Sequence, residues 1–363
     1  MHTQSKFRLL VVRLGAMGDI LHALPAVTAL RVTHPGWVID WVVEPRWRAM
    51  LAAEGSGGRP TELNAAKPNP AQPIVDQLHF ASTKDWRKSP TGAQTFHEIN
   101  ALRLALRAGD YDTVLDLQGA VRSAVIGRLA GCQRLIGEDE PRERAARWLF
   151  SERVVTQGTH VIEQDVELAA AVAGDELRPM GPWLPVDPAA EAWADGILRA
   201  EGRSATVLVN PGAGWGAKRW PVERYTAVAK ELIGQGLRIL VNVGPGEEEL
   251  GDAIVSGTGG GAVPLTCTLP QLITVTRRVG LVIAGDTGPL HLACALAKPV
   301  VGIYGPTDPS RNGPYGTRFR VLRSPESRRD HTRHAAPEAG LLTITPADVV
   351  KVAKELLCEE DER

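Results

Sequence analysis

Short apolar runs alternate with segments of helical periodicity along almost the whole chain. Runs such as LLVV and VVGIY have no polar alternation, as expected for parallel strands that are buried on both faces. The helical segments between the runs indicate βαβ units, and therefore an α/β fold with doubly wound parallel sheets. Strands are predicted at Phe7–Val12, Val38–Val43, Thr113–Leu117, Arg134–Ile136, Val207–Asn210, Arg238–Val243, Leu281–Ala284 and Val300–Tyr304.

The chain is long enough for two domains, since 363 residues exceed what one hydrophobic core usually serves. The segment LPVDP, Leu184–Pro188, precedes a helical segment and a fresh strand, and it indicates a break near residue 183. We predict two Rossmann-like domains, at 1–182 and 183–340. If these domains face each other, a ligand cleft lies between the carboxyl ends of both sheets.

Two further segments lie outside this alternation. In the tail, 341–363, Thr345 is a good N-cap and Pro346 suits the first helical position, so a helix is predicted there. Residues 52–73 are rich in Gly, Pro, Ala and Asn and are predicted to form a mobile loop.

The composition is that of an ordinary globular protein, with 44% hydrophobic and 23% charged residues. A formal net charge of −1 argues against a protein whose overall charge favours binding to nucleic acid. No apolar stretch approaches the roughly 20 residues of a membrane span, and the N-terminus lacks the pattern of a signal peptide. The four cysteines show no CxxC spacing. We therefore expect a reduced, cytoplasmic protein.

The most informative stretch is Leu281–Pro309, in which a strand, a glycine turn, a helix, a second strand and a second glycine turn follow one another. In the first turn, Gly285-Asp286-Thr287-Gly288, glycine lets backbone N–H groups approach a ligand, and the helix N-terminus favours an anion. The turn therefore predicts a phosphate site, and the alternative is a turn that binds nothing. His291, in the opening turn of the helix, either contacts the phosphate or packs locally.

Asp19 closes the first strand-to-helix turn, RLGAMGD. A carboxylate there can accept a proton from a hydroxyl group, and the alternative is a first-turn acid that only stabilises the helix. The spacing is not the dinucleotide fingerprint GxGxxG, and the strand continues past Asp40, where a ribose-binding acid would end it. A nicotinamide enzyme is therefore a weak interpretation.

Lys218 ends a glycine-rich loop, NPGAGWGAK, that follows a strand. A cation in this place can neutralise a leaving phosphate, and the alternative is a solvated loop lysine. The loop does not match the P-loop pattern, because neither Ser nor Thr follows the lysine.

Three other groups of candidates have mostly structural explanations. The acids Glu247–Glu249 follow a strand and suit ribose hydroxyls, but acids are also common in a first helical turn. Asp110-Tyr111-Asp112 matches a metal-binding DxD pattern, but it directly precedes a strand and is interpreted as structural. His331 and His334 have no partner at metal-ligand spacing, so metal binding is not favoured.

Positive charge is concentrated in the first half of the chain. The usual explanation is a solvated surface, and the alternative is a site for a negatively charged acceptor. The residues concerned are Lys84, Arg87, Lys88, Arg122, Arg142, Arg144 and Arg147.

Taken together, these motifs resemble the heptosyltransferases of glycosyltransferase family 9, and most closely those that add the first heptose of the lipopolysaccharide core. The similarity runs from about Phe7 to Tyr315 and again through the tail helix. The matching segments are Met17–Pro25, Asp116–Gly119, Lys218–Pro221, Asp286–His291 and Gly305–Pro309.

The resemblance implies a GT-B fold, with the acceptor bound by the N-terminal domain, ADP-heptose bound by the C-terminal one, and the tail helix packed on the N-terminal domain. It implies an inverting transfer of heptose to the inner Kdo of Kdo-lipid A, without a metal or other cofactor, at the cytoplasmic face of the inner membrane. Asp19 is then the general base and Lys218 the cation that binds the pyrophosphate. The resemblance assigns donor binding to Glu248, Asp286, Thr287, Gly288 and His291, and acceptor binding to Gly18, Lys84, Arg87, Lys88, Gln118 and Arg122.

Two features depart from the family pattern. The loop before Lys218 is rich in glycine where hydroxyl side chains are expected to contact phosphate, and the 52–73 loop is longer than the family needs. The alternatives that remain are an enzyme that adds the second heptose, a nicotinamide-dependent oxidoreductase, and a sugar-nucleotide-binding protein without catalysis.

Overall fold

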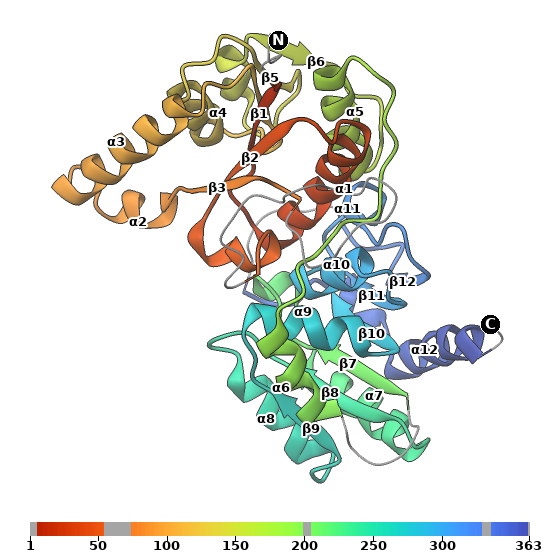
Figure 1. The fold of residues 1–363 in the computed structure, drawn as a ribbon. Coiled ribbons are helices and arrows are strands. Elements are labelled where there is room, and N and C mark those ends of the chain that lie inside the picture. Colours follow the sequence, from red (N-terminus) through yellow and green to blue (C-terminus); the bar gives the residue numbers. More distant parts are fainter. Residues whose placement is uncertain (1–5, 54–73, 199–204, 329–334, 362–363) are drawn as a thin grey trace. The chain divides into compact units, whose positions relative to one another are not determined.

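The computed structural model describes residues 6–53, 74–198, 205–328 and 335–361, and the chain folds into two compact units (Figure 1). The first unit is Met1–Asp187 and the second is Pro188–Arg363, so the break falls a few residues after the predicted one. The predicted 52–73 loop lies almost entirely outside the described residues.

The first unit is a six-stranded parallel sheet with the order β3-β2-β1-β4-β5-β6. Its strands are β1 (Arg8–Val12), β2 (Val38–Val43), β3 (Gln77–Phe80), β4 (Thr113–Asp116), β5 (Leu135–Glu138) and β6 (Glu152–Val154). Its helices are α1 (Met17–Thr33), η1 (Pro45–Met50), α2 (Thr83–Lys88), α3 (Ala93–Ala108), α4 (Val121–Leu129), η2 (Arg144–Leu149) and α5 (Val161–Ala173).

The second unit repeats this architecture, with a parallel sheet of order β12-β11-β10-β7-β8-β9. Its strands are β7 (Thr206–Asn210), β8 (Arg238–Asn242), β9 (Ala262–Leu265), β10 (Leu281–Gly285), β11 (Val300–Tyr304) and β12 (Phe319–Arg323). Its helices are α6 (Pro188–Leu198), η3 (Gly216–Lys218), α7 (Val222–Gly234), α8 (Glu248–Gly257), α9 (Leu269–Arg278), α10 (Gly288–Ala295), α11 (Pro309–Asn312), η4 (Gly340–Thr343) and α12 (Pro346–Asp361).

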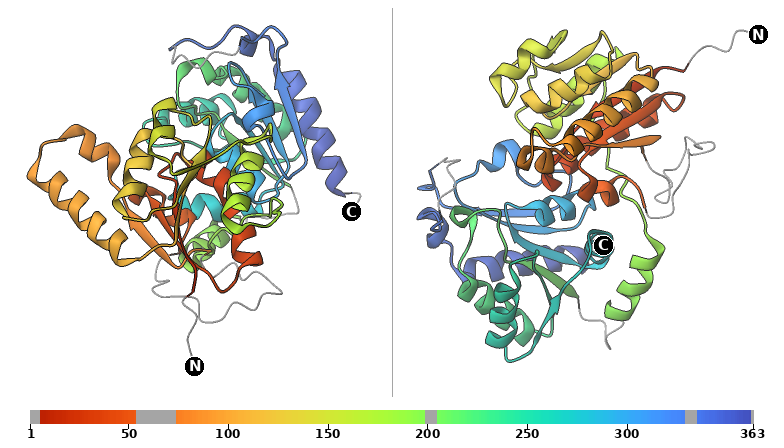
Figure 2. Two further views of the ribbon diagram at one scale, coloured as in Figure 1. Left: turned by 90° about the horizontal axis from the view of Figure 1, so that it is seen from above. Right: turned by 90° about the vertical axis from the view of Figure 1, so that its left-hand side faces the viewer.

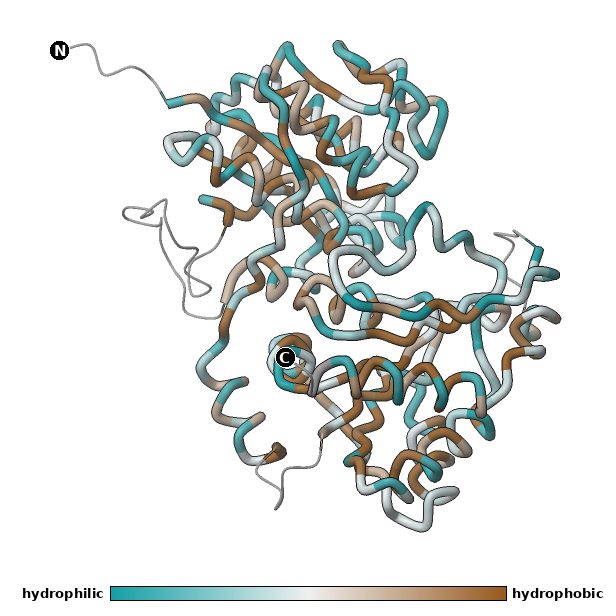
Figure 3. Tube along the Cα trace, turned by 90° about the vertical axis from the view of Figure 1, so that its right-hand side faces the viewer, coloured by the Kyte–Doolittle hydropathy of each residue, from teal (hydrophilic) through white to brown (hydrophobic). Residues whose placement is uncertain are grey.

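The eight predicted strands are all present, with ends shifted by at most two residues. The pattern missed β3, β6, β9 and β12, and these four are the edge strands of the two sheets. The inner strands of both sheets are buried almost throughout, and the apolar runs of the chain are brown in the hydropathy trace (Figure 3). The α/β fold with two doubly wound sheets is confirmed.

The tail forms the predicted helix α12, and its N-terminus is capped as expected. The Thr345 N–H donates to Asp348 Oδ2 at 3.0 Å, and the Asp348 N–H donates to Thr345 Oγ1 at 3.2 Å. The expectation that this helix packs on the N-terminal domain is wrong. Its side chains Val349, Ala353 and Leu356 are buried in the core of the second unit, where α12 contacts α7, β10, β11 and β12.

The DxD-like segment has the structural role that was predicted. The Arg8 N–H donates to Asp112 Oδ2 at 2.7 Å, and the Tyr111 hydroxyl donates to Asp40 Oδ2 at 2.7 Å. Asp40 is 1% exposed in the middle of β2, so it also has no access to a ribose. These acids join strands and do not form a metal site.

Helices α2 and α3 form an arm that projects from the side of the first sheet (Figure 2). α2 has no buried residue, whereas α3 buries Thr95, Leu102 and Leu106 against the unit. Among the described residues, no helix is long and apolar enough to cross a membrane.

Replacing Gly137 by alanine tests how tightly β5 packs. A methyl group at this position would overlap the ring of Phe150, which is 7% exposed in the core of the first unit. Because overpacking a rigid core costs about 1–3 kcal/mol, we expect the free energy of unfolding to fall by that amount in urea titrations followed by tryptophan fluorescence. In the matched variant Gly36→Ala the added methyl group meets no atom within 4 Å, so its stability should not change. Equal urea midpoints for the two variants would show that the Phe150 ring moves aside without a cost in stability.

Candidate active site

Both sheets have a topological switch point, the place where the strand order reverses its direction across the sheet. This point lies between β1 and β4 in the first sheet and between β7 and β10 in the second. In open α/β sheets the crevice at such a point, beyond the carboxyl ends of the strands, is the ligand site. The candidate residues Asp19, Gln118, Lys218 and Asp286 lie in or beside the loops that follow these four strands.

Asp19 lies in the first turn of α1, where it has the helix-capping role that was one of the two alternatives; its role as a base stays a prediction. Its Oδ2 accepts a hydrogen bond from the Ala16 N–H at 3.0 Å, which caps the helix. Two arginines also approach it: Arg13 Nη2 is 3.7 Å from Oδ1 and Arg142 Nη1 is 3.9 Å from Oδ2. The carboxylate is 33% exposed, so it is held in place and can still be reached by a substrate.

Arg13 follows β1 directly and is itself buried, at 6% exposure. Its Nε donates to the backbone oxygen of Asp19 at 3.1 Å, in addition to the contact with the carboxylate. Arg13 therefore holds both the carboxylate of Asp19 and the first turn of α1 in position. The only signal for Arg13 in the sequence is a basic residue at the end of an apolar strand.

Two buried carboxyl groups lie near the same arginine. Burial raises the pKa of Asp116, at the end of β4, to about 6, although the Gly119 N–H, the Ser123 hydroxyl and the charge of Arg13 oppose this rise. Burial also raises the pKa of Asp165, on α5, to about 7 against the opposing charge of Arg13. Arg13 thus interacts with three acids, of which Asp19 is the least buried.

The remaining residues predicted to bind the acceptor have different environments. Gln118 Oε1 accepts from the Leu14 N–H at 3.1 Å, so this side chain joins the two loops of the switch point. Gly18 is the second residue of α1 and is half-buried, beside Asp19. The exposed residues are Arg122 on α4 and Lys84, Arg87 and Lys88 on α2, of which Lys88 is paired with Asp85 at 2.8 Å.

In the second unit, Lys218, Asp286 and His291 form a connected cluster. Lys218 Nζ donates to Asp286 Oδ2, and His291 Nε2 lies 3.1 Å from Asp286 Oδ1. The ring of Trp215 lies 4.3 Å from Lys218 Nζ and adds a cation–π contact. Since β7 and β10 are neighbours, the glycine loop after β7 brings Lys218 to the turn after β10.

The cluster holds Asp286 as a carboxylate. Burial alone would raise its pKa, but the hydrogen bond and charge of His291, together with the charge and hydrogen bond of Lys218, hold the pKa far below its ordinary value. Asp286 therefore does not accept a proton at neutral pH. It positions the cation and the imidazole at the sheet edge.

Thr287 and Gly288 form the start of α10, next to the cluster. Thr287 is the N-cap in extended conformation, and its hydroxyl donates to the backbone oxygen of Gly285 at 3.2 Å. The first N–H groups of a helix have no partner within the helix, and they carry its positive dipole end. The lysine and the first N–H groups of α10 thus lie beside each other, an arrangement that suits an anion.

Among the three adjacent glutamates, Glu248 is exposed and Glu247 is directed at the glycine loop. Glu248 Oε1 accepts from the Gly246 N–H at 3.0 Å. Glu247 Oε1 lies 3.9 Å from Arg219, and its carboxylate lies against Gly212. The assignment of Glu248 to the ribose stays a prediction, and the structure adds Glu247 as a second candidate.

Two asparagines at this edge were not singled out from the sequence, whereas Thr307 belongs to the segment Gly305–Pro309 that carried the resemblance. Asn242 Nδ2 donates to Asn210 Oδ1 at 2.7 Å, so polar side chains end the neighbouring strands β8 and β7. In the described part of the chain, the buried Thr307 hydroxyl has no hydrogen-bond partner. A polar residue at the end of an apolar strand is the signal that identifies the two asparagines.

The described residues contain no group of three or more His, Cys, Asp and Glu side chains that could hold a metal ion. His331 and His334 lie outside them, so the prediction for those histidines is untested.

Comparison with known proteins identifies relatives over most of the chain. The sequence profile of glycosyltransferase family 9 (heptosyltransferase) matches residues 99–341. Lipopolysaccharide heptosyltransferase 1 of Escherichia coli K12 is 31% identical and covers 88% of this chain and 94% of its own. Lipopolysaccharide heptosyltransferase 2 of the same strain is 24% identical and covers 98% of this chain and 99% of its own.

Solved structures show the same fold. E. coli heptosyltransferase WaaC with ADP-2-deoxy-2-fluoro heptose superimposes with a TM-score of 0.74 at 27% identity, over 96% of this chain and 99% of that one. E. coli ADP-heptose lipopolysaccharide heptosyltransferase II has a TM-score of 0.72 at 22% identity, over 98% and 100% of the two chains, and it supports the fold alone.

Proposed function

Because the chain belongs to glycosyltransferase family 9, the heptosyltransferases, we propose that it transfers L-glycero-D-manno-heptose from ADP-heptose to the inner Kdo of Kdo-lipid A. The 31% identity to lipopolysaccharide heptosyltransferase 1 supports the first heptose as the group transferred. The solved relative WaaC holds an ADP-heptose analogue, which supports ADP-heptose as the donor. Since this acceptor is a lipid, the protein would work at the cytoplasmic face of the inner membrane.

The observation that carries the proposal is the cluster of Lys218, Asp286 and His291 beside the N-terminus of α10. Inversion at the sugar needs a base on the acceptor hydroxyl and a stabilised leaving diphosphate on the opposite face of the sugar. Lys218 and the helix N-terminus supply fixed positive charge for the leaving group, which is the role that a metal has in other transferases. Asp19 supplies the base.

Transfer of the second heptose is the alternative supported by an observation, since lipopolysaccharide heptosyltransferase 2 is 24% identical over nearly the whole chain. The two functions differ only in the acceptor, so one assay separates them. ADP release is measured with Kdo-lipid A and with the same acceptor already carrying one heptose.

We expect ADP release with the Kdo-only acceptor, little with the heptosylated one, and no loss of rate in EDTA. Preference for the heptosylated acceptor would establish the alternative. Binding of ADP-heptose without ADP release on either acceptor would identify a binding protein, and a rate abolished by EDTA and restored by Mg²⁺ would contradict the metal-free mechanism.

A further inference from the structure

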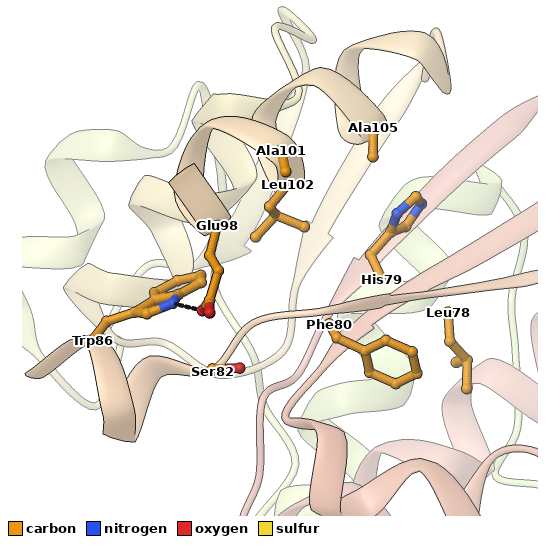
Figure 4. Close-up of a pocket in the computed structure, with 9 residues that line it drawn as sticks. All are labelled: Leu78, His79, Phe80, Ser82, Trp86, Glu98, Ala101, Leu102 and Ala105. Carbon is orange, nitrogen blue, oxygen red and sulfur yellow. Dashed lines mark hydrogen bonds between the residues drawn. The ribbon is translucent and has the colours of Figure 1, made fainter. Parts of the chain in front are cut away.

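A groove of about 400 Å³ lies where the arm of α2 and α3 meets the edge of the first sheet (Figure 4). β3 contributes Leu78, His79 and Phe80, and α3 contributes Ala101, Leu102 and Ala105. β3 is an edge strand, so no neighbouring strand closes this side of the sheet. Phe80 is 41% exposed, which leaves a large apolar side chain next to the groove in contact with water.

Three of the polar side chains that line the groove, His79, Trp86 and Glu98, have hydrogen-bond partners within the protein. His79 Nε2 lies 2.8 Å from the Tyr111 hydroxyl, and Trp86 Nε1 donates to Glu98 Oε2 at 2.8 Å (Figure 4). Gln94 also donates to Glu98, and these two hydrogen bonds lower the pKa of that acid and keep its charge engaged. The groove therefore offers hydrocarbon surface to a ligand and few free polar groups.

Cations lie on the short helix beside the groove. α2 has the sequence TKDWRK, in which Lys84, Arg87 and Lys88 are exposed and Asp85 is paired with Lys88. Trp86, on the same helix, lines the groove. An apolar groove with the exposed cations Lys84 and Arg87 on the adjoining helix matches a lipid that carries an anionic group next to its acyl chains.

Two hydrogen bonds connect the start of α2, beside the groove, to the loop that leads to Asp19. The Thr83 hydroxyl at the start of α2 donates to Glu44 Oε1 at 2.8 Å, and the Glu44 N–H donates to the Leu14 oxygen at 3.1 Å. Leu14 belongs to the loop that leads to Asp19. The start of α2 and the loop before Asp19 are thus held together in the first unit.

We propose that this groove binds an acyl chain of the lipid acceptor, while the cations of α2 bind an anionic group of the same molecule. The inference rests on the proposed function, because it takes the acceptor to be a lipid. It assigns the apolar part of that acceptor to the junction of β3 with α2 and α3.

Filling the groove tests the proposal without removing any contact of the fold. Ala105 is exposed on α3 and lines the groove, so Ala105→Phe places a ring in the space of the acyl chain. Ala93→Phe is the matched control, because Ala93 is exposed on the same helix and does not line the groove. Each variant is assayed for ADP release with detergent-dispersed Kdo-lipid A and with its fully deacylated form.

We expect Ala105→Phe to raise KM for the acylated acceptor about tenfold, since a phenyl ring displaces about two methylene groups. The KM of Ala105→Phe for the deacylated acceptor should stay unchanged. Ala93→Phe should keep its KM for both acceptors. An unchanged KM of Ala105→Phe for the acylated acceptor would overturn the proposal. So would an equal rise with both acceptors, which would indicate an effect on the sugar site.

A second measurement does not depend on activity. Trp86 lines the groove, so lipid micelles with brominated acyl chains should quench part of the tryptophan fluorescence of the unaltered protein. This quenching should be absent in Ala105→Phe and present in Ala93→Phe. If the unaltered protein released no ADP with either acceptor, the proposed function would fail, whereas equal quenching of all three proteins would refute the groove.

Discussion

Asp19→Asn is expected to lower kcat by about 10²–10⁴-fold, the usual range for the loss of a general base. Asparagine has the same shape and keeps an oxygen that can accept the Ala16 N–H, so the start of α1 is preserved. The lost property is the negative charge that Arg13 and Arg142 hold in place. ADP-heptose should bind with unchanged affinity, since the proposed donor groups belong to the second unit. Turnover is measured as ADP release, and donor affinity by calorimetry.

Asp348→Asn is the matched control for this result. Asp348 caps α12 as Asp19 caps α1, and the hydrogen bond that it accepts from a backbone N–H has the same length, 3.0 Å. It lies at the start of the tail helix, away from the switch point of the second sheet. Near-normal turnover in Asp19→Asn, as in Asp348→Asn, would leave Asp19 a helix-capping acid and would remove it from the mechanism.

The inner strands could be predicted from the sequence because burial on both faces makes them continuous apolar runs. The missed strands have a neighbour on one side only, so polar and charged residues are tolerated there. β3 (QLHF) and β6 (ERV) are examples, and Arg153 in β6 is exposed. Hydrophobic pattern alone cannot separate such a segment from a loop, since its backbone pairing is decided by the neighbouring strand.

The candidate residues could be placed at strand ends from glycine turns, but their partners could not. Lys218 and Asp286 are 68 positions apart, and they meet because β7 and β10 are adjacent. Adjacency of strands is a property of the sheet order, which no local pattern contains. Arg13 and Trp215 were missed for the same reason, since a basic residue or a tryptophan near a loop has many possible environments.

The tail helix shows where a resemblance can mislead about packing. The capping residues of α12 are local, so they were predicted correctly from Thr345, Pro346 and Asp348. The partner of its apolar face is not local. In this chain Val349, Ala353 and Leu356 complete the core of the second unit beside η4 and α7, so the helix stabilises the second sheet.

Lys218→Ala is expected to weaken ADP binding about 10–100-fold, the range for losing a hydrogen bond to a charged group. Lys218 has 11% of its side chain exposed, between the ring of Trp215 and the carboxylate of Asp286, so its ammonium group is directed to one place. A diphosphate that enters there shares the lysine with Asp286, which retains His291 as a partner. Because negative charge grows on the leaving group during the reaction, kcat should fall further, by about 10²–10³-fold.

The comparison of ADP with adenosine shows whether this loss arises at the phosphates. Adenosine should bind Lys218→Ala and the unaltered protein equally, while Lys230→Ala, an exposed change on α7, should bind both ligands normally. Removing the lysine also leaves the buried carboxylate of Asp286 with less positive charge beside it, so the melting temperature is measured in parallel. An equal loss for ADP and adenosine would indicate that the glycine loop has collapsed. Unchanged ADP affinity would mean that Lys218 serves only to neutralise Asp286, and the leaving-group charge would then have to be stabilised by the N-terminus of α10 alone.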